Sequence, residues 1–342
     1  MAVYVASIGD RMTDTVANML QLARHVCGTQ TARLRAALQR LLRKPDEEAV
    51  HDVRVACRRL RVALGITRKL FGADQAEAIR TRLKELLTLL GGTRDAEVLA
   101  ARAEKLAESG DRGAAELLRI LRPRTEQQRR ATARRGERSA LTILPEQIER
   151  LIARRPAGSK GALKHQAMPV AQRAERVLAK RMRTLWQFAE LDSESHATEL
   201  HQLRIEMKKL RYAAEFFGPA LVPEKTAKAK GGPAHKALPG RAARHPLKTI
   251  VKIAEGYQEL LGNLHDAAVA EETLTKWQRD GLPWDAPVAG GKDEARCEPV
   301  LPLQALLKAA RKDQTALRRE FGKGWGAKLL KKLERTVKAL GS

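Results

Sequence analysis

The sequence has few aromatic residues, few cysteines and no long apolar segment, and each shortage excludes a class of protein. Aromatic residues make up 4% of the 342 residues, whereas proteins that bind single-stranded nucleic acid stack bases on aromatic side chains. The three cysteines, Cys27, Cys57 and Cys297, form neither a zinc-binding pattern nor a disulfide framework. No apolar run approaches the ~20 residues of a membrane span, and the N-terminus does not resemble a secretory signal. We therefore expect no membrane span and a reducing, cytoplasmic location.

Acidic residues are also scarce relative to basic ones. The chain has 65 Lys and Arg against 40 Asp and Glu, a formal net charge of +25. A field this positive concentrates anions near the surface. The partner is therefore expected to be a polyanion, which leaves nucleic acid, an anionic membrane or another phosphate polymer.

Helical periodicity covers most of the chain, and strand signals are nearly absent. Ala, Leu, Arg, Lys and Glu are strong helix formers, and apolar residues recur at three- and four-residue steps. The pattern predicts helices over 12–43, 47–71, 74–91, 93–108, 112–138, 168–191, 196–218, 247–262, 265–279, 301–321 and 325–340.

Several short segments predict where these helices begin and end. Pro45 and the acids after it are typical of a helix start, and Pro123 is expected to break or start a helix. The Gly- and Pro-containing segment 155–161 is the best linker, so we divide the chain into units 1–158 and 159–342. Segments 223–246 and 281–300 are predicted to be loops.

Two different motifs occur twice, in the same order. Residues 51–64, HDVRVACRRLRVAL, match residues 201–214, HQLRIEMKKLRYAA; residues 90–98, LGGTRDAEV, match residues 261–269, LGNLHDAAV. The second pair of motifs is farther apart by about the length of the 223–246 loop. This self-similarity predicts two copies of one helical unit, the second carrying a basic insertion.

The first motif places cations on one side of a helix and apolar residues on the other. At 100° per residue its basic positions form a single stripe. A solvated face normally mixes both signs, because like charges one turn apart repel. Stripes of one sign in both copies predict a bound anion, with ordinary ion pairs as the alternative. The stripes are His51, Arg54, Arg58 and Arg61; His201, Arg204, Lys208 and Arg211; and, with the same spacing but less support, Arg173, Arg176, Lys180 and Arg183.

On these two repeated motifs the chain resembles the CHAD family, the "conserved histidine α-helical domain", over roughly residues 10–340. The resemblance implies an all-α fold of two helical-bundle halves that face each other around a basic central pore or groove. It also implies binding of inorganic polyphosphate and association with polyphosphate granules. Besides the two histidine-led stripes, the motif positions that it marks are Arg94, Asp95, His265 and Asp266.

Each of these positions has a second interpretation. A metal site at His51 or His201 would need a ligand one turn away, but arginines lie there, so no metal or cofactor is expected. The histidines are either buried structural residues or phosphate donors whose affinity rises below about pH 6.5. Asp95 and Asp266 are expected to support helix caps at Gly92 and Asn263, or to orient a neighbouring His or Arg.

Three functions remain on the sequence alone. Polyphosphate binding without catalysis is favoured, because a slim polymer fits a narrow basic groove. A nucleic-acid-binding protein using phosphate contacts is the alternative. An enzyme is less favoured, because the sequence has no phosphate-binding P-loop and no acidic cluster for two metal ions.

Overall fold

The computed structural model describes residues 18–91, 94–138, 140–156, 158–222, 245–281 and 303–341. These ranges form helices and contain no strand, which confirms the all-α prediction. Short 3-10 turns at Ala140–Ile143 (η1) and Trp186–Phe188 (η2) join some of them. The α-helices are α1 (Met19–Arg43), α2 (Glu47–Phe71), α3 (Ala73–Leu89), α4 (Arg94–Glu108), α5 (Arg112–Arg138), α6 (Leu144–Ala153), α7 (Lys160–Ala167), α8 (Val170–Leu185), α9 (Ala197–Leu221), α10 (Pro246–Asp280), α11 (Gln304–Gly324) and α12 (Ala327–Lys338).

The start and end of α2 follow from its terminal residues. The side chain of Asp46 accepts a hydrogen bond from the backbone N–H of Ala49 at 2.8 Å, and Glu47 and Glu48 occupy the first turn, where the helix dipole favours negative charge. At the other end Gly72 has φ 94°, a conformation that favours glycine. Both ends were predicted from the sequence.

Three predicted helix boundaries are wrong. Pro123 lies inside α5, which continues through it, and α9 continues past Gly218 and Pro219 to Leu221. Residues 247–279 form one helix, α10, instead of two. Segment 155–161 is confirmed as non-helical at its start, but α7 begins within it at Lys160. The predicted loops at 223–246 and 281–300 lie almost wholly outside the described residues.

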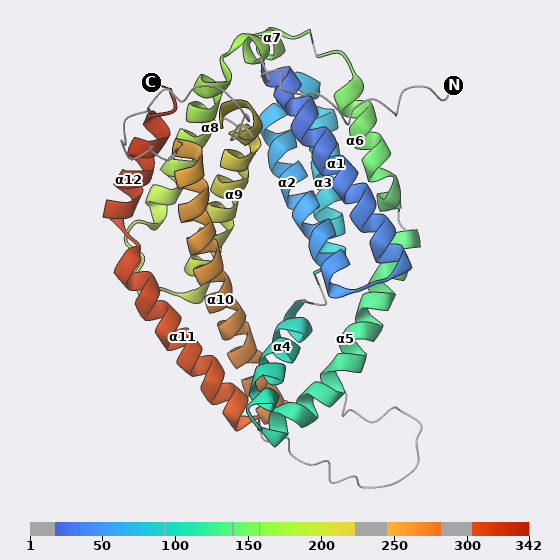
Figure 1. The fold of residues 1–342 in the computed structure, drawn as a ribbon, viewed down its shortest axis with the longest axis vertical. Helices are drawn as coiled ribbons and strands as arrows, with labels where there is room; N and C mark the ends of the chain where they lie inside the picture. The colour runs from blue at the N-terminus through green and yellow to red at the C-terminus, as the bar shows by residue number, and fades with distance from the viewer. Residues whose placement is uncertain are drawn as a thin grey trace, which may run out of the picture.

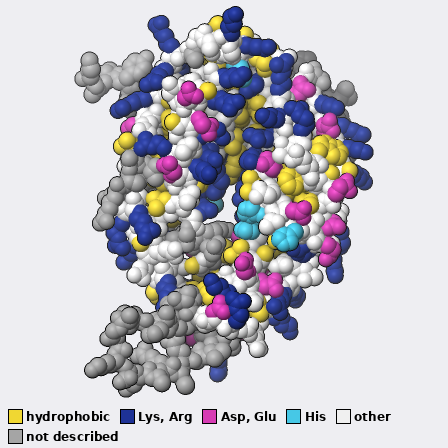
Figure 2. All heavy atoms as spheres, turned by 180° about the vertical axis from the view of Figure 1, so that it is seen from behind, with side chains coloured by type: hydrophobic (Ala, Val, Ile, Leu, Met, Phe, Trp, Pro, Cys, Tyr) yellow, Lys and Arg dark blue, Asp and Glu magenta, His cyan; other side chains and the backbone are white. Residues whose placement is uncertain are grey.

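Two groups of helices stand side by side (Figure 1). One group contains α1, α2, α3 and α6, and the other contains α8, α9, α10 and α12, with α2 and α9 on the facing sides. Below them α4 and α5 meet α11 and the end of α10. In the view from behind, the surface is hollowed between the groups, and Lys and Arg side chains gather along the hollow (Figure 2). A pore passing through the molecule stays a prediction.

The apolar sides of α2 and α9 form the centre of the larger core. Those residues are at most 1% exposed, as the stripe analysis predicted: Val53, Cys57, Leu60 and Leu64 on α2, and Leu203, Met207, Leu210 and Ala214 on α9. Burying a Leu side chain contributes about 1.5–3 kcal/mol. This burial leaves the opposite, basic side of each helix facing the hollow.

A smaller core joins the two sequence halves at the lower end. Leu99 of α4 and Leu117 of α5 pack in one cluster with Leu274 of α10 and Leu306 of α11. Helices from both sides of residue 158 therefore share buried contacts. Dividing the chain there into two units stays a prediction.

No helix in the described ranges is long and apolar enough to cross a lipid bilayer.

Candidate functional site

Cations of the first and second stripes come together between α2 and α9. Lys208 of α9 shows this most directly, since its pKa falls from 10.5 to about 7. Burial is the main cause, and the positive charges of Arg204 on its own helix and of Arg58 and Arg54 on α2 add to it. Asp266 on α10 acts in the opposite direction. We call Arg54, Arg58, Arg204 and Lys208 the paired rows.

Two members of the paired rows make no ion pair in the described part of the chain. Lys208 makes no ion pair or hydrogen bond there, and Arg58 makes one hydrogen bond, to the hydroxyl of Tyr212 at 3.3 Å. An amine and a guanidinium held partly out of water lose hydration. Their charge is therefore available to an anion that enters the hollow.

Arg211, by contrast, is held by carboxylates. Its Nε donates to Glu215 at 2.7 Å, and its other nitrogens reach Glu255 at 2.8 Å and Gln258 at 3.4 Å. Arg59 of α2 reaches the same Glu215 at 3.1 Å. The ion-pair alternative thus describes Arg211, the last residue of the second stripe.

The first and second motifs of each copy contact each other. In the first copy, Arg54 donates to the backbone carbonyl of Leu90 at 2.8 Å. In the second, the guanidinium of Arg204 lies against Gly262, where an added Cβ would be 3.6 Å from it. The Leu-Gly of the second motif thus supports the leading arginine of the first motif in both copies.

Two of the three predicted histidines meet. The rings of His201 and His265 are 4.5 Å apart between centroids, and Nδ1 of His201 is buried without a hydrogen bond. Burial, then the charges of Arg204 and Lys208, lowers the pKa of His201 below its usual value. His51 is exposed at the start of α2. Within the described residues no group of three or more His, Cys, Asp or Glu is placed to hold a metal ion.

Of the two predicted acids, the structure describes the side chain of Asp266 but not that of Asp95. Asp266 lies inside α10, as does Asn263, so the predicted cap at Asn263 is wrong. The charge of Asp266 acts on Lys208 instead. That Asp266 orients a neighbouring His or Arg stays a prediction. The side chains of Arg94 and Asp95 lie outside the described part of the structure, with Gly92.

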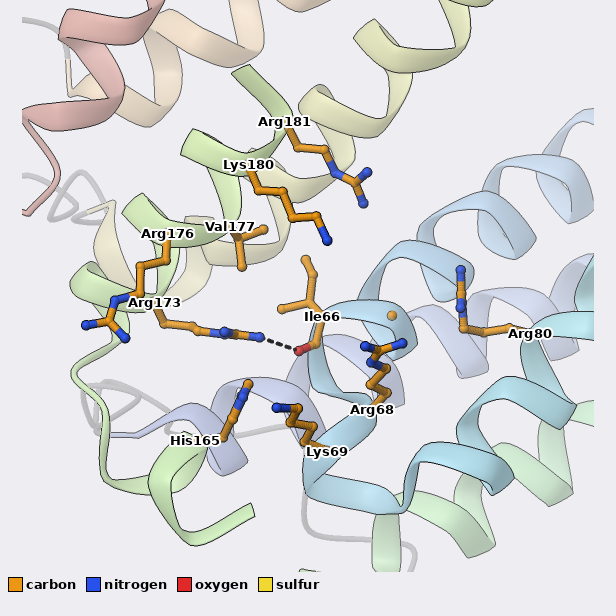
Figure 3. Close-up of a pocket in the computed structure, with 11 residues that line it drawn as sticks. Ile66, Arg68, Lys69, Arg80, His165, Arg173, Arg176, Val177, Lys180 and Arg181 are labelled. Atoms are coloured by element: carbon orange, nitrogen blue, oxygen red, sulfur yellow. Dashed lines mark hydrogen bonds between the residues drawn. The ribbon is translucent and has the colours of Figure 1, made fainter. Parts of the chain in front are cut away.

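The third stripe lines a separate cavity, which we call the α8 cavity (Figure 3). It has a volume of about 370 Å³, and Arg173, Arg176 and Lys180 of α8 form one wall. Arg61 of the first stripe adjoins it, because its backbone carbonyl accepts a hydrogen bond from Arg80 in the lining at 3.1 Å. The third stripe therefore does not join the paired rows.

Sequence reasoning missed five basic residues of this lining: Arg68, Lys69, Arg80, His165 and Arg181. One signal was present. Positions 54, 58, 61, 65 and 68 continue a single face of α2, so the stripe extends through Gly65 to Arg68. Arg80 belongs to α3 and His165 to α7, and only the packing of α2, α3, α7 and α8 brings them together.

A family model and two curated relatives match this sequence. The model of the CHAD domain family matches residues 25–275. The uncharacterized proteins MT2285 and Rv2226, from two strains of Mycobacterium tuberculosis, are each 31% identical over 193 residues, which are 52% of this chain and 36% of the relative. The match thus spans well under half the length of these relatives.

Two solved structures share the fold. The CHAD domain from the plant Ricinus communis aligns with a TM-score of 0.59 at 20% identity, over 96% of this chain and 94% of that one. PptA from Streptomyces chartreusis aligns with a TM-score of 0.55 at 16% identity, over 94% of this chain and all of that one. Because the family model spans most of the sequence, from α1 into α10, this protein belongs to the CHAD domain family.

Proposed function

We propose that this protein binds inorganic polyphosphate along the paired rows, without catalysing its turnover. One observation carries the proposal: Lys208 lies among arginines of both α2 and α9, and burial together with their positive charge lowers its pKa to about 7. Such a cluster of like charges is unfavourable until an anion enters. The paired rows form a site whose electrostatic cost is offset by the ligand.

The shape of the site favours a slim polymer. The arginines and lysine belong to α2 and α9, two long helices on the facing sides of the two helix groups (Figure 1). A duplex needs an open surface of about its own width, and single-stranded nucleic acid needs aromatic platforms. Tyr212, the aromatic residue at the paired rows, is 7% exposed and offers no such platform. A linear phosphate chain needs only charge, and guanidinium groups bind phosphate oxygens in bidentate fashion.

The test compares ligands on one protein. Binding of long polyphosphate, short polyphosphate, single-stranded DNA and duplex DNA is measured at two salt concentrations. Long polyphosphate is expected to bind tightest, because a chain that spans both helices gains from multivalency. Stronger binding of duplex DNA would favour the nucleic-acid alternative. Release of orthophosphate from polyphosphate in the presence of the protein would show that the protein catalyses turnover, against this proposal.

A variant pair ties the binding to the paired rows. R58E/K208E reverses two charges that make no ion pair in the described residues, and we expect it to lose at least about tenfold in affinity. The matched control K308E/K312E reverses two exposed lysines on α11, which belong to none of the three stripes. Equal losses in both variants would show that net charge, and not this site, binds the polymer.

Association with polyphosphate granules is part of the same proposal. In cells, the tagged protein is expected at granules, and R58E/K208E is expected away from them. If the wild type and R58E/K208E are both found at granules, the paired rows are not needed for that location.

A further inference from the structure

The α8 cavity concentrates positive charge. Its wall on α8 carries Arg173, Arg176, Lys180 and Arg181, and α2 contributes Arg68 and Lys69 opposite. Arg80 from α3 and His165 from α7 complete the lining, which contains no carboxylate. In Figure 3 the side chains of Lys180, Arg173, Arg68 and His165 converge from different sides on one space.

Few of these charges are neutralised within the described residues. Arg80 pairs with Glu77, which lies outside the lining. No ion pair is present there for Arg68, Lys69, Arg176 or Lys180. Surface cations of a stable protein are normally interspersed with acids, since like charges repel. A wall of cations without acids, on two facing helices, indicates a site that binds an anion.

Arg173 gives a second, independent observation. Its terminal nitrogen donates to the backbone carbonyl of Ile66 at 3.1 Å, which fixes the guanidinium across the gap between α8 and α2. Its Nε is buried and has no hydrogen-bond partner. A buried donor without a partner is destabilising. A ligand oxygen in the cavity would satisfy it.

The cavity is separate from the paired rows. Arg68 lies ten residues after Arg58 on α2, which is ~15 Å along the helix axis. Arg61 lies between them, and its pKa is lowered first by burial and then by the charge of Arg80. The same face of α2 therefore leads from the paired rows to the α8 cavity.

We propose that the α8 cavity is a second anion site that binds a short run of terminal phosphoryl groups, as in a linear oligophosphate. The cavity of about 370 Å³ has room for such a ligand. Terminal phosphoryl groups carry more charge and more free oxygens than internal ones. The ligand comes either as a free oligophosphate or as the end of a longer chain whose body lies on the paired rows; only the second source rests on the function proposed above.

His165 supplies an internal reporter of occupancy. Burial lowers its pKa to about 4, and Arg173 of α8, Lys69 and Arg68 of α2 and Lys164 of α7 add to this. An anion held among these cations reverses their effect. Filling the site with an anion therefore raises the pKa of the imidazole from that value.

The experiment uses the full chain and tripolyphosphate as the probe. R68E/K180E reverses two exposed cations of the lining that make no hydrogen bond or ion pair in the described residues, so the fold is expected to persist. We expect its affinity for tripolyphosphate to fall at least about tenfold. K308E/K312E, with the same change in charge, is expected to bind as the wild type does. Circular dichroism checks that both variants are folded.

R58E/K208E separates this inference from the proposed function. It is expected to retain tripolyphosphate binding while losing the long polymer. If R68E/K180E also weakens long polyphosphate, the cavity holds chain ends; if long-chain affinity is unchanged, it holds free oligophosphates. In wild-type protein, imidazole NMR signals of His165 are expected to titrate at higher pH when tripolyphosphate is present.

Two results would overturn the second site. One is tripolyphosphate affinity that R68E/K180E lowers no more than K308E/K312E does. The other is a His165 titration that tripolyphosphate leaves unchanged. Failure of the long polymer to bind wild-type protein would overturn the proposed function, yet tripolyphosphate binding at the α8 cavity would still stand.

Discussion

The Nε–H of Arg58 on α2 donates a hydrogen bond to the hydroxyl oxygen of Tyr212 on α9 at 3.3 Å. The guanidinium carbons of Arg59 and Arg211 lie 6.0 and 5.9 Å from the centre of the same ring. One buried tyrosine thus contacts arginines of both helices, through its oxygen and through its π-system. It stabilises an approach of like charges that α2 and α9 would otherwise resist.

The pH dependence of polyphosphate binding is expected to follow Lys208. In the free protein its pKa is about 7, and a bound polyanion raises it, so binding takes up a proton. Because of this group, affinity should change little below about pH 7 and fall as the pH rises to about 9. Phosphate groups, whose last pKa is near 6, are already fully charged over that range, so they do not cause the fall.

Two conservative variants test this assignment. K208R keeps its charge throughout the range and should bind nearly as well at about pH 9 as at about pH 7. K209R alters the neighbouring lysine, which pairs with Glu206, and should keep the wild-type profile. A K208R profile that still slopes like the wild type would assign the proton to another group.

The stability of the protein is expected to increase when Lys208 loses its charge. Its folded pKa lies below the usual 10.5, so the unfolded chain binds the proton more tightly. The resulting destabilisation is complete below about pH 7 and disappears as the pH rises toward about 10.5. K208M should therefore melt higher than the wild type at pH 7, by about 2–4 °C for each kcal/mol gained.

Thermal unfolding at several pH values measures this difference. The gap between K208M and the wild type should narrow as the pH rises, while K208M binds polyphosphate more weakly at pH 7. A K208M protein that melts lower at neutral pH would contradict the electrostatic account of the paired rows.

The salt dependence of binding is expected to report how many phosphates the paired rows contact. For single-stranded nucleic acid the slope of log K against log salt is about −0.7 for each phosphate neutralised. R58E/K208E should therefore flatten the slope for long polyphosphate by about 1.4 or more. Parallel lines for variant and wild type, displaced but equally steep, would place these side chains outside the interface.

Cys27 and Cys57 are expected to resist thiol reagents in the folded protein. Both are 0% exposed, and burial raises the pKa of each thiol to about 12. Only the thiolate is nucleophilic, so both access and ionisation are suppressed. Alkylation followed by peptide mapping should label these two positions only after denaturant is added. If the folded protein were labelled at these positions as fast as a cysteine in a free peptide, α1 and α2 would have to open readily.

The sequence allowed the faces of α2 and α9 to be predicted, but not the partners of each cation. The helical period of 3.6 residues predicted Val53 and Leu203 in the core, where they lie, with the basic stripes on the opposite side of each helix. That Arg58 approaches Lys208 while Arg211 is held by Glu255 depends on how α2, α9 and α10 pack, which no spacing along one helix contains. The α8 cavity was missed for the same reason, since Arg80 and His165 reach it from separate helices.

Helix termini within repeated motifs were the other weak point. The same Leu-Gly motif ends α3 near Leu90 but lies inside α10 at Leu261. Glycine lowers helix stability by only about 1 kcal/mol relative to alanine, and tertiary packing overrides that amount. A motif shared by two copies thus predicts a contact, Arg54 to Leu90 or Arg204 to Gly262, better than it predicts a helix boundary.

The unbroken helix α10 has a mechanical consequence. Its 35 residues extend ~50 Å, from the group that contains α9 and α12 down to α4 and α11. A single rod that braces both ends leaves no hinge on that side by which the two groups could swing together. The spacing between α2 and α9 is therefore set before any ligand arrives, and the binding proposed here would cost the protein little conformational freedom.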